Sequence, residues 1–254
     1  MCVLALAWNV HPRWRLLLAG NRDEFHERPT AALSPWESGG DVLAGRDLRS
    51  GGTWAGLDRG GRMAVVTNVR DPRIVLPQAP SRGRLTTEFL TTAGHATRYG
   101  QALLGSAVDY APFNLLVSDA VRCEFISNYP APRQMSLSDG VHGLSNGDLD
   151  EPWPKTRRLA GALADWLAAG ESDLEPLWRA LTDETPAPDD ELPDTGLELE
   201  RERMLSAIFI RDAVYGTRAS TLIAIGYDGQ GWISERRFNA GGEFTGETTL
   251  SNNN

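Results

Sequence analysis

The sequence has few of the residues that build disulfide-bonded or metal-bound folds. Cysteine occurs only twice in 254 residues, at Cys2 and Cys123, so the chain has no disulfide framework. It contains no CxxC or HExxH pattern, which removes the common structural and catalytic metal motifs. We therefore expect no metal or other cofactor, and a reducing compartment, which we take to be the cytoplasm.

The chain is also poor in positive charge and in long apolar segments. Its 25 Lys and Arg residues face 34 Asp and Glu residues, which gives a net charge of −9. A negative protein has no global field with which to attract nucleic acid or anionic membranes. The apolar run 3–8 is too short for a membrane span or a signal-peptide core. We expect a soluble protein with no nucleic-acid partner and no integral membrane contact.

The residues that are present suit one α+β domain over 1–254. A hydrophobic content of 41% is enough for a substantial core. Strand patterns at both ends of the chain and helical patterns in the middle differ from the alternation that builds a parallel sheet. The segment 185–200 is dense in Pro, Asp and Glu, which predicts a mobile acidic loop. We expect Ser251 and the closing asparagines to be frayed.

Hydrophobic periodicity and turn residues predict the individual elements. The runs 3–8 and 14–19 flank turn residues and predict a β-hairpin, and a second hairpin is predicted in the Gly-rich region 51–68. Cys123 lies in an apolar strand pattern, so we expect a small core residue. Further predicted elements are strands at 113–118, 123–127, 220–225 and 231–238, and helices at 81–105, 153–167 and 172–181.

Cys2 is the first candidate for chemistry. If Met1 is removed, Cys2 carries a thiol and a free α-amine whose unperturbed pKa is about 7.7–8.0, so nucleophile and base share one residue. The polar run Asn21-Arg22-Asp23-Glu24 interrupts apolar sequence. We expect Asn21 to Asp23 just past the end of the second strand, where antiparallel pairing brings them beside Cys2.

Other polar segments at predicted strand ends, 67–72, 142–147 and 215–221, could complete such a site. A thiol that attacks a carbonyl needs a base, donors for the oxyanion, and charges that fix the amine and the thiolate. Asn68 or Asn146 could donate to the oxyanion, although each also suits a turn. Asp23 could hold the α-amine, and Arg22 or Arg218 could lower the pKa of the thiol.

Eight short motifs follow one another in order along most of the chain: Met1-Cys2, 21–24, 52–56, 67–70, 81–83, 143–146, 152–155 and 215–221. Taken together, they resemble the NRDE family, also called the transport and Golgi organisation 2 family. That family in turn resembles the cysteine branch of the N-terminal nucleophile hydrolases, which includes bile-salt hydrolases and penicillin V acylases. The resemblance implies a four-layer αββα sandwich of two antiparallel sheets flanked by helices.

Carried over residue by residue, the resemblance implies a catalytic set. Cys2 is then the nucleophile and Asp23 the carboxylate that holds its amine. Asn68 and Asn146 become oxyanion or backbone-positioning residues, and Arg218 becomes the cation near the thiol. The hydrolases place an arginine a few residues before the aspartate, whereas Arg22 is adjacent to Asp23 here, so Arg22 ranks below Arg218.

Two functions follow as expectations. The first is hydrolysis of an amide or thioester bond of an acyl-bearing small molecule, with Arg22, Trp54 and His142 in contact with the substrate. The second is a non-catalytic carrier of a hydrophobic ligand such as haem, lipid or acyl-CoA, because the NRDE family has been linked to the handling of these molecules. The sequence favours a structural or trafficking role less, and it does not determine the oligomeric state.

Overall fold

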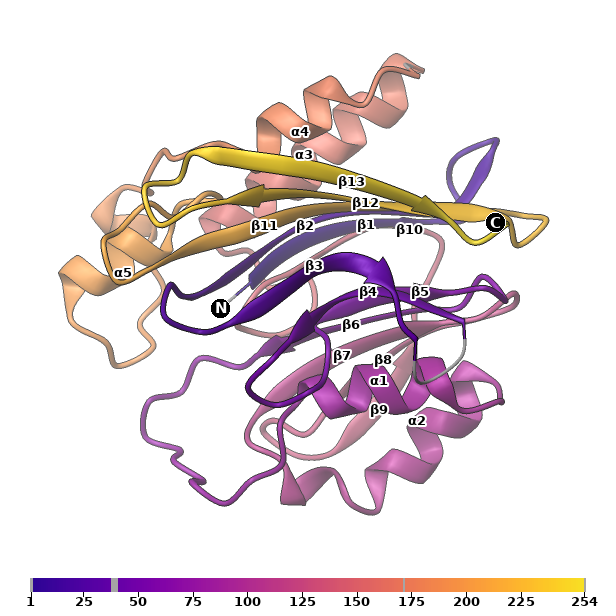
Figure 1. Ribbon diagram of the computed structural model, residues 1–254. Helices are drawn as coiled ribbons and strands as arrows, with labels where there is room; N and C mark the ends of the chain where they lie inside the picture. The colour runs from indigo at the N-terminus through magenta and orange to yellow at the C-terminus, as the bar shows by residue number, and fades with distance from the viewer. Residues whose placement is uncertain (1, 38–40, 171, 254) are drawn as a thin grey trace.

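Two antiparallel sheets are stacked face to face in a computed structural model that describes residues 2–37, 41–170 and 172–253 (Figure 1). One sheet has six strands, in the order β10 (Gly140–Leu144), β1 (Cys2–Trp8), β2 (Trp14–Phe25), β11 (Tyr215–Gly226), β12 (Gly231–Phe238) and β13 (Phe244–Ser251). The other has seven, in the order β3 (Thr30–Pro35), β4 (Val42–Asp47), β5 (Ala55–Asp58), β6 (Met63–Asn68), β7 (Phe113–Ser118), β8 (Cys123–Ser127) and β9 (Arg133–Ser136).

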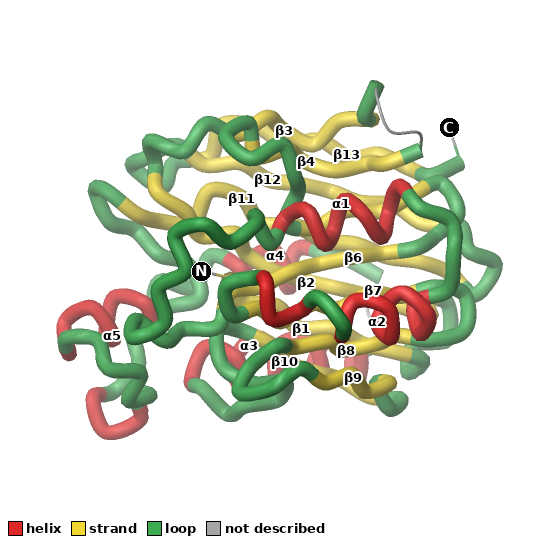
Figure 2. Tube along the Cα trace, turned by 90° about the horizontal axis from the view of Figure 1, so that it is seen from below, coloured by secondary structure: helices red, strands yellow, loops and turns green. Residues whose placement is uncertain are grey.

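Helices cover the outer face of each sheet. The seven-stranded sheet packs against α1 (Gly83–Thr91) and α2 (Ala96–Leu104), and the six-stranded sheet packs against α3 (Pro154–Ala169) and α4 (Glu175–Leu181) (Figures 1 and 2). Helix α5 (Leu199–Leu205) lies at the end of the sandwich where the chain begins. Two short 3-10 helices, η1 (Ala107–Asp109) and η2 (Asp189–Glu191), lie in connecting segments.

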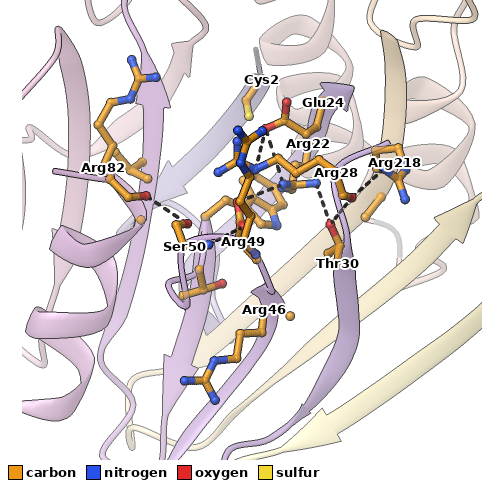
Figure 3. A pocket seen from close by; sticks show the side chains of 18 of the residues that line it. Cys2, Arg22, Glu24, Arg28, Thr30, Arg46, Arg49, Ser50, Arg82 and Arg218 are labelled. Atoms are coloured by element: carbon orange, nitrogen blue, oxygen red, sulfur yellow. Dashed lines mark hydrogen bonds and ion pairs between the residues drawn. The ribbon is translucent and has the colours of Figure 1, made fainter. Parts of the chain in front are cut away.

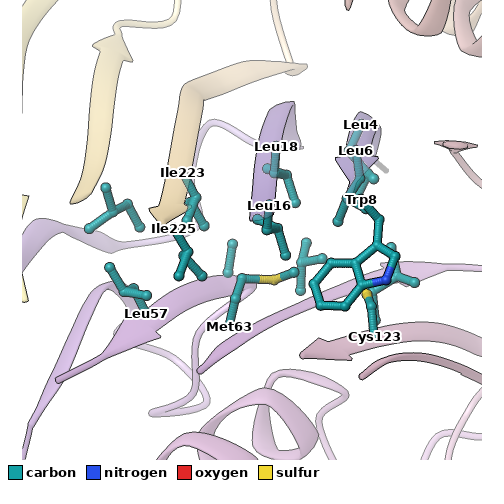
Figure 4. Packing of buried hydrophobic residues seen from close by; sticks show 14 of the residues in the cluster. Leu4, Leu6, Trp8, Leu16, Leu18, Leu57, Met63, Cys123, Ile223 and Ile225 are labelled. Carbon is teal, nitrogen blue, oxygen red and sulfur yellow. The ribbon is translucent and has the colours of Figure 1, made fainter. Parts of the chain in front are cut away.

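Three apolar clusters fill the spaces between these layers. The central cluster joins residues of both sheets, among them Leu6, Leu18 and Ile223 of one sheet and Met63 and Cys123 of the other (Figure 4). A second cluster lies under α1 and α2, and a third under α3 and α4. Such burial supplies the main driving force for folding. The predicted αββα sandwich is therefore confirmed, and Cys123 is a core residue.

The first predicted hairpin is correct, but its second strand is longer than expected. Strand β2 continues to Phe25, so Asn21, Arg22 and Asp23 lie inside the strand and not beyond its end. The physical reason is a partner from the far end of the chain, because β11 pairs with β2 along its full length. Cys2 lies directly opposite Arg22 in the register of β1 and β2.

The helix predicted over 81–105 is divided into α1 and α2. The backbone at Gly94 has φ of +148°, a conformation that interrupts a helix and that glycine adopts readily. The helix predicted from residue 153 is confirmed as α3, which has Pro154 in its first turn and ends before Gly170 in the left-handed conformation.

Two predictions near the carboxyl end concern order. The segment 185–200 contains η2 and the start of α5, and the Ala187 backbone N–H donates to Ser206 Oγ at 2.8 Å. Ser251 belongs to β13, and Asn252 Oδ1 accepts a hydrogen bond from the Gly231 N–H at 2.8 Å. The expectation of fraying was wrong for these two residues, since β12 provides a partner for the last strand.

No helix in the described residues combines the length and the hydropathy needed to cross a membrane.

Candidate active site

The polar run in β2 is divided between the two faces of its sheet. Successive side chains of a strand point in opposite directions. Arg22 and Glu24 line a cavity that also contains Cys2. Asn21 Nδ2 donates instead to the carbonyl oxygens of Leu181 and Ile208, on the helix-covered face. The run 21–24 therefore places side chains in the cavity on one face of the sheet and against the helical layer on the other face.

The cavity has a volume of about 680 Å³, and its lining includes the first residue of β1 and residues 22–24 of β2. Cys2 is 8% exposed and lies at its inner wall, close to Arg22 and Glu24 (Figure 3). Strands of both sheets and the segment 76–83 form the remaining walls. The volume is within the range of pockets that take a drug-sized molecule.

The wall of the cavity is rich in arginine. Arg28 Nε donates to Asp47 Oδ2 at 2.6 Å. Arg22 Nη2 lies 3.6 Å from Glu24 Oε2 and 3.8 Å from Asp47 Oδ2. Since the cations outnumber the carboxylates, the cavity favours a ligand with negative charge. The lining residues with charge are seven arginines, at positions 22, 28, 46, 49, 82, 218 and 237, and four acids, at positions 23, 24, 47 and 235.

Opposing effects act on the Cys2 thiol. Burial raises its pKa above the ordinary value, and the charge of Asp23 acts in the same direction. A hydrogen bond from the Asp23 backbone and the charge of Arg22 lower it. The Cys2 backbone is held in place as well, because Ser145 Oγ donates to its carbonyl oxygen at 2.9 Å. In contrast, burial strongly raises the pKa of Cys123, which lies in the central core.

Asp23 is buried next to Cys2 and is held from β11. Thr217 Oγ1 donates to Asp23 Oδ1 at 2.8 Å, and Tyr215 Oη donates to the Asp23 backbone oxygen at 2.9 Å. Burial raises the pKa of Asp23, whereas Lys155 and Arg22 lower it. Met1 lies outside the described residues, so the predicted contact between Asp23 and the Cys2 amine stays a prediction.

Arg218 reaches the cavity through a β-bulge. Thr217 pairs with Asp23 and Ala219 pairs with Arg22, so Arg218 is an extra residue in β11. Its guanidinium donates to the backbone carbonyls of Phe25, His26 and Arg28, which form the turn after β2. Burial lowers the pKa of Arg218, and nearby Arg22 adds to this effect. Arg218 thus shares the cavity with Cys2 and also braces one of its walls.

The two candidate oxyanion residues are in contact with each other. Asn146 is fully buried, and its Nδ2 donates to the backbone oxygen of Asn68 at 2.9 Å. Asn68 lines the cavity of Cys2. Asn146 lines a smaller cavity of about 220 Å³ and not the larger one, and its backbone oxygen accepts from the Arg70 N–H. In this geometry Asn146 positions Asn68.

The predicted substrate contacts differ in position. Arg22 and Trp54 line the cavity. His142 does not belong to its described lining, because Nδ1 of this residue lies 2.8 Å from Asp150 Oδ2 and Nε2 lies 2.9 Å from the Ser138 oxygen. Both ring nitrogens are therefore engaged, one with the loop that precedes β10 and one with the loop that follows it.

Two basic residues near Cys2 have no role predicted from the sequence. Arg82 lines the cavity, burial lowers its pKa, and its charge interacts with Cys2. Lys155 is 1% exposed and interacts electrostatically with Asp23 and Cys2. The sequence does mark Lys155 as unusual, because it is the one lysine among 25 Lys and Arg residues.

Comparisons with known proteins agree with this geometry. Two crystal structures of point variants of conjugated bile acid hydrolase from Clostridium perfringens superpose with TM-scores of 0.51 and 0.55 at 9% identity. The first superposition covers 96% of this chain and 96% of the hydrolase, and the second covers 100% of this chain and 93% of the hydrolase. At such low identity the likeness shows a shared fold and no more.

Relatives at higher identity cover nearly the whole chain. The Transport and Golgi organization protein 2 homologs of Bos taurus and Homo sapiens are 33% and 32% identical over 93% of this chain and 92% of each relative. A family profile described as Transport and Golgi organisation 2 matches residues 1–240. The chain therefore belongs to the Transport and Golgi organisation 2 family.

Proposed function

We propose that this protein is an N-terminal nucleophile hydrolase that cleaves an amide or thioester bond of an acyl-bearing small molecule. The observation that carries the proposal is the position of Cys2 at the inner wall of a large cavity, with Asp23 buried beside it. The proposal requires removal of Met1, which would give Cys2 a free amine. The fold shared with conjugated bile acid hydrolase supports it.

The proposed reaction follows from the groups around Cys2. The α-amine takes the thiol proton, and Sγ attacks the carbonyl carbon to form an S–C bond. The Asn68 side chain is the candidate donor to the oxyanion. The C–N or C–S bond then breaks as the amine returns its proton to the leaving group. Water hydrolyses the resulting acyl thioester and restores the thiol.

The lining of the cavity narrows the class of substrate. Seven arginines against four carboxylates favour an acyl compound that also bears an anionic group, such as a carboxylate, sulfonate or phosphate. Trp54, Val66 and Leu76 add apolar side chains to the lining. An acyl chain and a charged head group would both find complementary surface.

The same lining favours a second candidate, a carrier of an anionic hydrophobic ligand such as haem, a lipid or acyl-CoA. The two candidates differ in whether Cys2 reacts. We therefore propose to incubate acyl amides, acyl-CoA thioesters and haem with wild type and Cys2→Ser. Hydrolysis by wild type and its loss in Cys2→Ser would support the enzyme, because a hydroxyl is a much poorer nucleophile near neutral pH. Equal binding to both proteins without turnover would instead support the carrier.

Alkylation followed by intact mass tests the nucleophile directly. We expect wild type to lack Met1 and to react with iodoacetamide once, at Cys2, because Cys2 lines the cavity beside Arg22. Cys123 lies in the central core, where burial strongly raises its pKa. Cys123→Ala is the matched control and should react at the wild-type rate. A mature protein that retains Met1 would contradict the proposed self-activation of Cys2.

A further inference from the structure

Lys155 is a buried lysine in a protein that otherwise uses arginine. It is the one lysine in the chain, and 1% of its surface is exposed. Within the described residues, Nζ has no hydrogen-bond partner. A buried ammonium is destabilising unless an opposite charge compensates it. The groups around Lys155 must therefore supply the opposite charge.

Lys155 lies behind Cys2 as seen from the cavity. It belongs to the first turn of α3, which packs against β1 and β10. Gly143 of β10 permits this close approach, because a Cβ there would lie 2.5 Å from Cγ2 of the neighbouring Thr156. Lys155 is not part of the described cavity lining. It therefore acts on Cys2 through the interior of the protein and not by touching a substrate.

Four buried charged side chains lie near Cys2: Asp23, Lys155, Arg70 and Glu202. Arg70 and Glu202 are paired at 2.5 Å, with 4% of each side chain exposed. Lys155 interacts with Arg70, Asp23, Cys2 and Glu202. Lys155 exerts the largest of the charge effects that lower the pKa of Asp23, and Arg22 adds to it. With all four groups charged, two positive and two negative charges balance.

We propose that Lys155 is a positioning residue whose buried ammonium compensates the charge of Asp23 and so favours loss of the Cys2 thiol proton. The role rests on the proposed function in one respect, namely that Cys2 is the nucleophile. Loss of the Lys155 charge would leave a net negative charge behind Cys2. That charge would oppose formation of the thiolate and would also favour the protonated α-amine.

The remaining charged or titratable neighbours of Cys2 do not replace Lys155. Arg22 and Arg82 act from the cavity side, where Arg22 faces Glu24 and Asp47. Tyr215 remains neutral, because burial raises its pKa well above the ordinary value. Burial lowers the pKa of Lys155 to about 8, so most of it is charged at pH 7.

The first experiment uses the single lysine as its own probe. Lysine labelled with ¹³C at Cε gives one NMR signal, and its titration reports the Lys155 pKa without any substrate. We expect Asp23→Asn to lower that pKa by about one unit or more, because an opposite charge is lost. Cys2→Ser is the control and should change it less. An unchanged pKa in Asp23→Asn would overturn the proposal.

The second experiment measures the rate of Cys2 alkylation against pH. We expect Lys155→Met to move the midpoint up by about one pH unit, roughly a tenfold lower rate at pH 7. Asp23→Asn combined with Lys155→Met should return the midpoint toward wild type, since both charges are removed together. Arg157→Met removes a charge from the exposed side of the same helix and should leave the midpoint unchanged.

The outcomes separate the two proposals. A midpoint in Lys155→Met equal to that of wild type would overturn the role of Lys155, whatever wild type hydrolyses. A shifted midpoint in a protein that hydrolyses nothing would retain that role and remove the hydrolase. If Lys155→Met does not fold, the lysine titration in Asp23→Asn still decides, since that variant keeps the lysine.

Discussion

Replacement of Asn21 by alanine should destabilise the protein far more than an average substitution. Asn21 is fully buried in β2. Its side chain makes three hydrogen bonds: Nδ2 donates to the oxygens of Leu181 and Ile208 at 2.8 and 2.9 Å, and Oδ1 accepts from Ser220 Oγ at 2.6 Å. These bonds join β2 to β11, to the end of α4 and to the segment before β11.

The magnitude follows from what is left unpaired. Each hydrogen bond contributes about 1 kcal/mol net, and a buried group that loses its partner costs about 1–3 kcal/mol. Asn21→Ala leaves two carbonyls and a hydroxyl without their partner. We expect a loss of about 3–5 kcal/mol in the free energy of unfolding. At about 2–4 °C per kcal/mol for a domain of this size, Tm should fall by roughly 6–20 °C.

Thermal unfolding followed by circular dichroism measures this effect. Gln101→Ala is a suitable control, because Gln101 is exposed on α2 and alanine is at least as good a helix former. We expect Tm of the control to stay within about 2 °C of wild type. A loss below about 1 kcal/mol for Asn21→Ala would refute the argument that this asparagine fastens the three segments together.

Two further predictions concern charged pairs. The hydrogen bond to Asp150 is the main cause that raises the pKa of His142. The stabilisation that this pair adds to the folded state is therefore complete below about pH 6.5 and is lost as pH rises through the higher pKa of His142 in the folded protein. Burial raises the pKa of Asp150, but bonds from His142 and Gly143 lower it overall, so its contribution is lost as pH falls below about 3.8. His142→Gln should therefore reduce Tm more at pH 5.5 than at pH 8.5, and an equal reduction at both would contradict this. Glu202→Gln removes the carboxylate paired with buried Arg70 and should lower the free energy of unfolding, measured in urea, by about 3 kcal/mol or more. Glu200→Gln is the control, because Glu200 is exposed on the same helix, α5.

Much of the fold follows from local pattern. The apolar runs around Asn9 predict the first hairpin, since turn residues between two β-capable segments leave few alternatives. Strands β7 and β8 and helix α3 begin and end near the predicted positions for the same reason. Local pattern did not predict strands β3, β9 and β13, because each is largely exposed and lacks a continuous apolar pattern. Nor did it predict β4 and β10, which are mostly buried but contain glycine, a residue depleted in strands.

The sequence by itself determined that Cys2 and the polar run at 21–24 would lie side by side, because a short turn forces two neighbouring strands to pair. Only the tertiary structure decided which way that run faces. Its strand continues because β11, about two hundred residues later, pairs with it, and the pleat then directs Arg22 to the cavity and Asn21 to the helices. The placement of Lys155 behind Cys2 likewise depends on α3 crossing β1, a long-range contact that local sequence cannot encode.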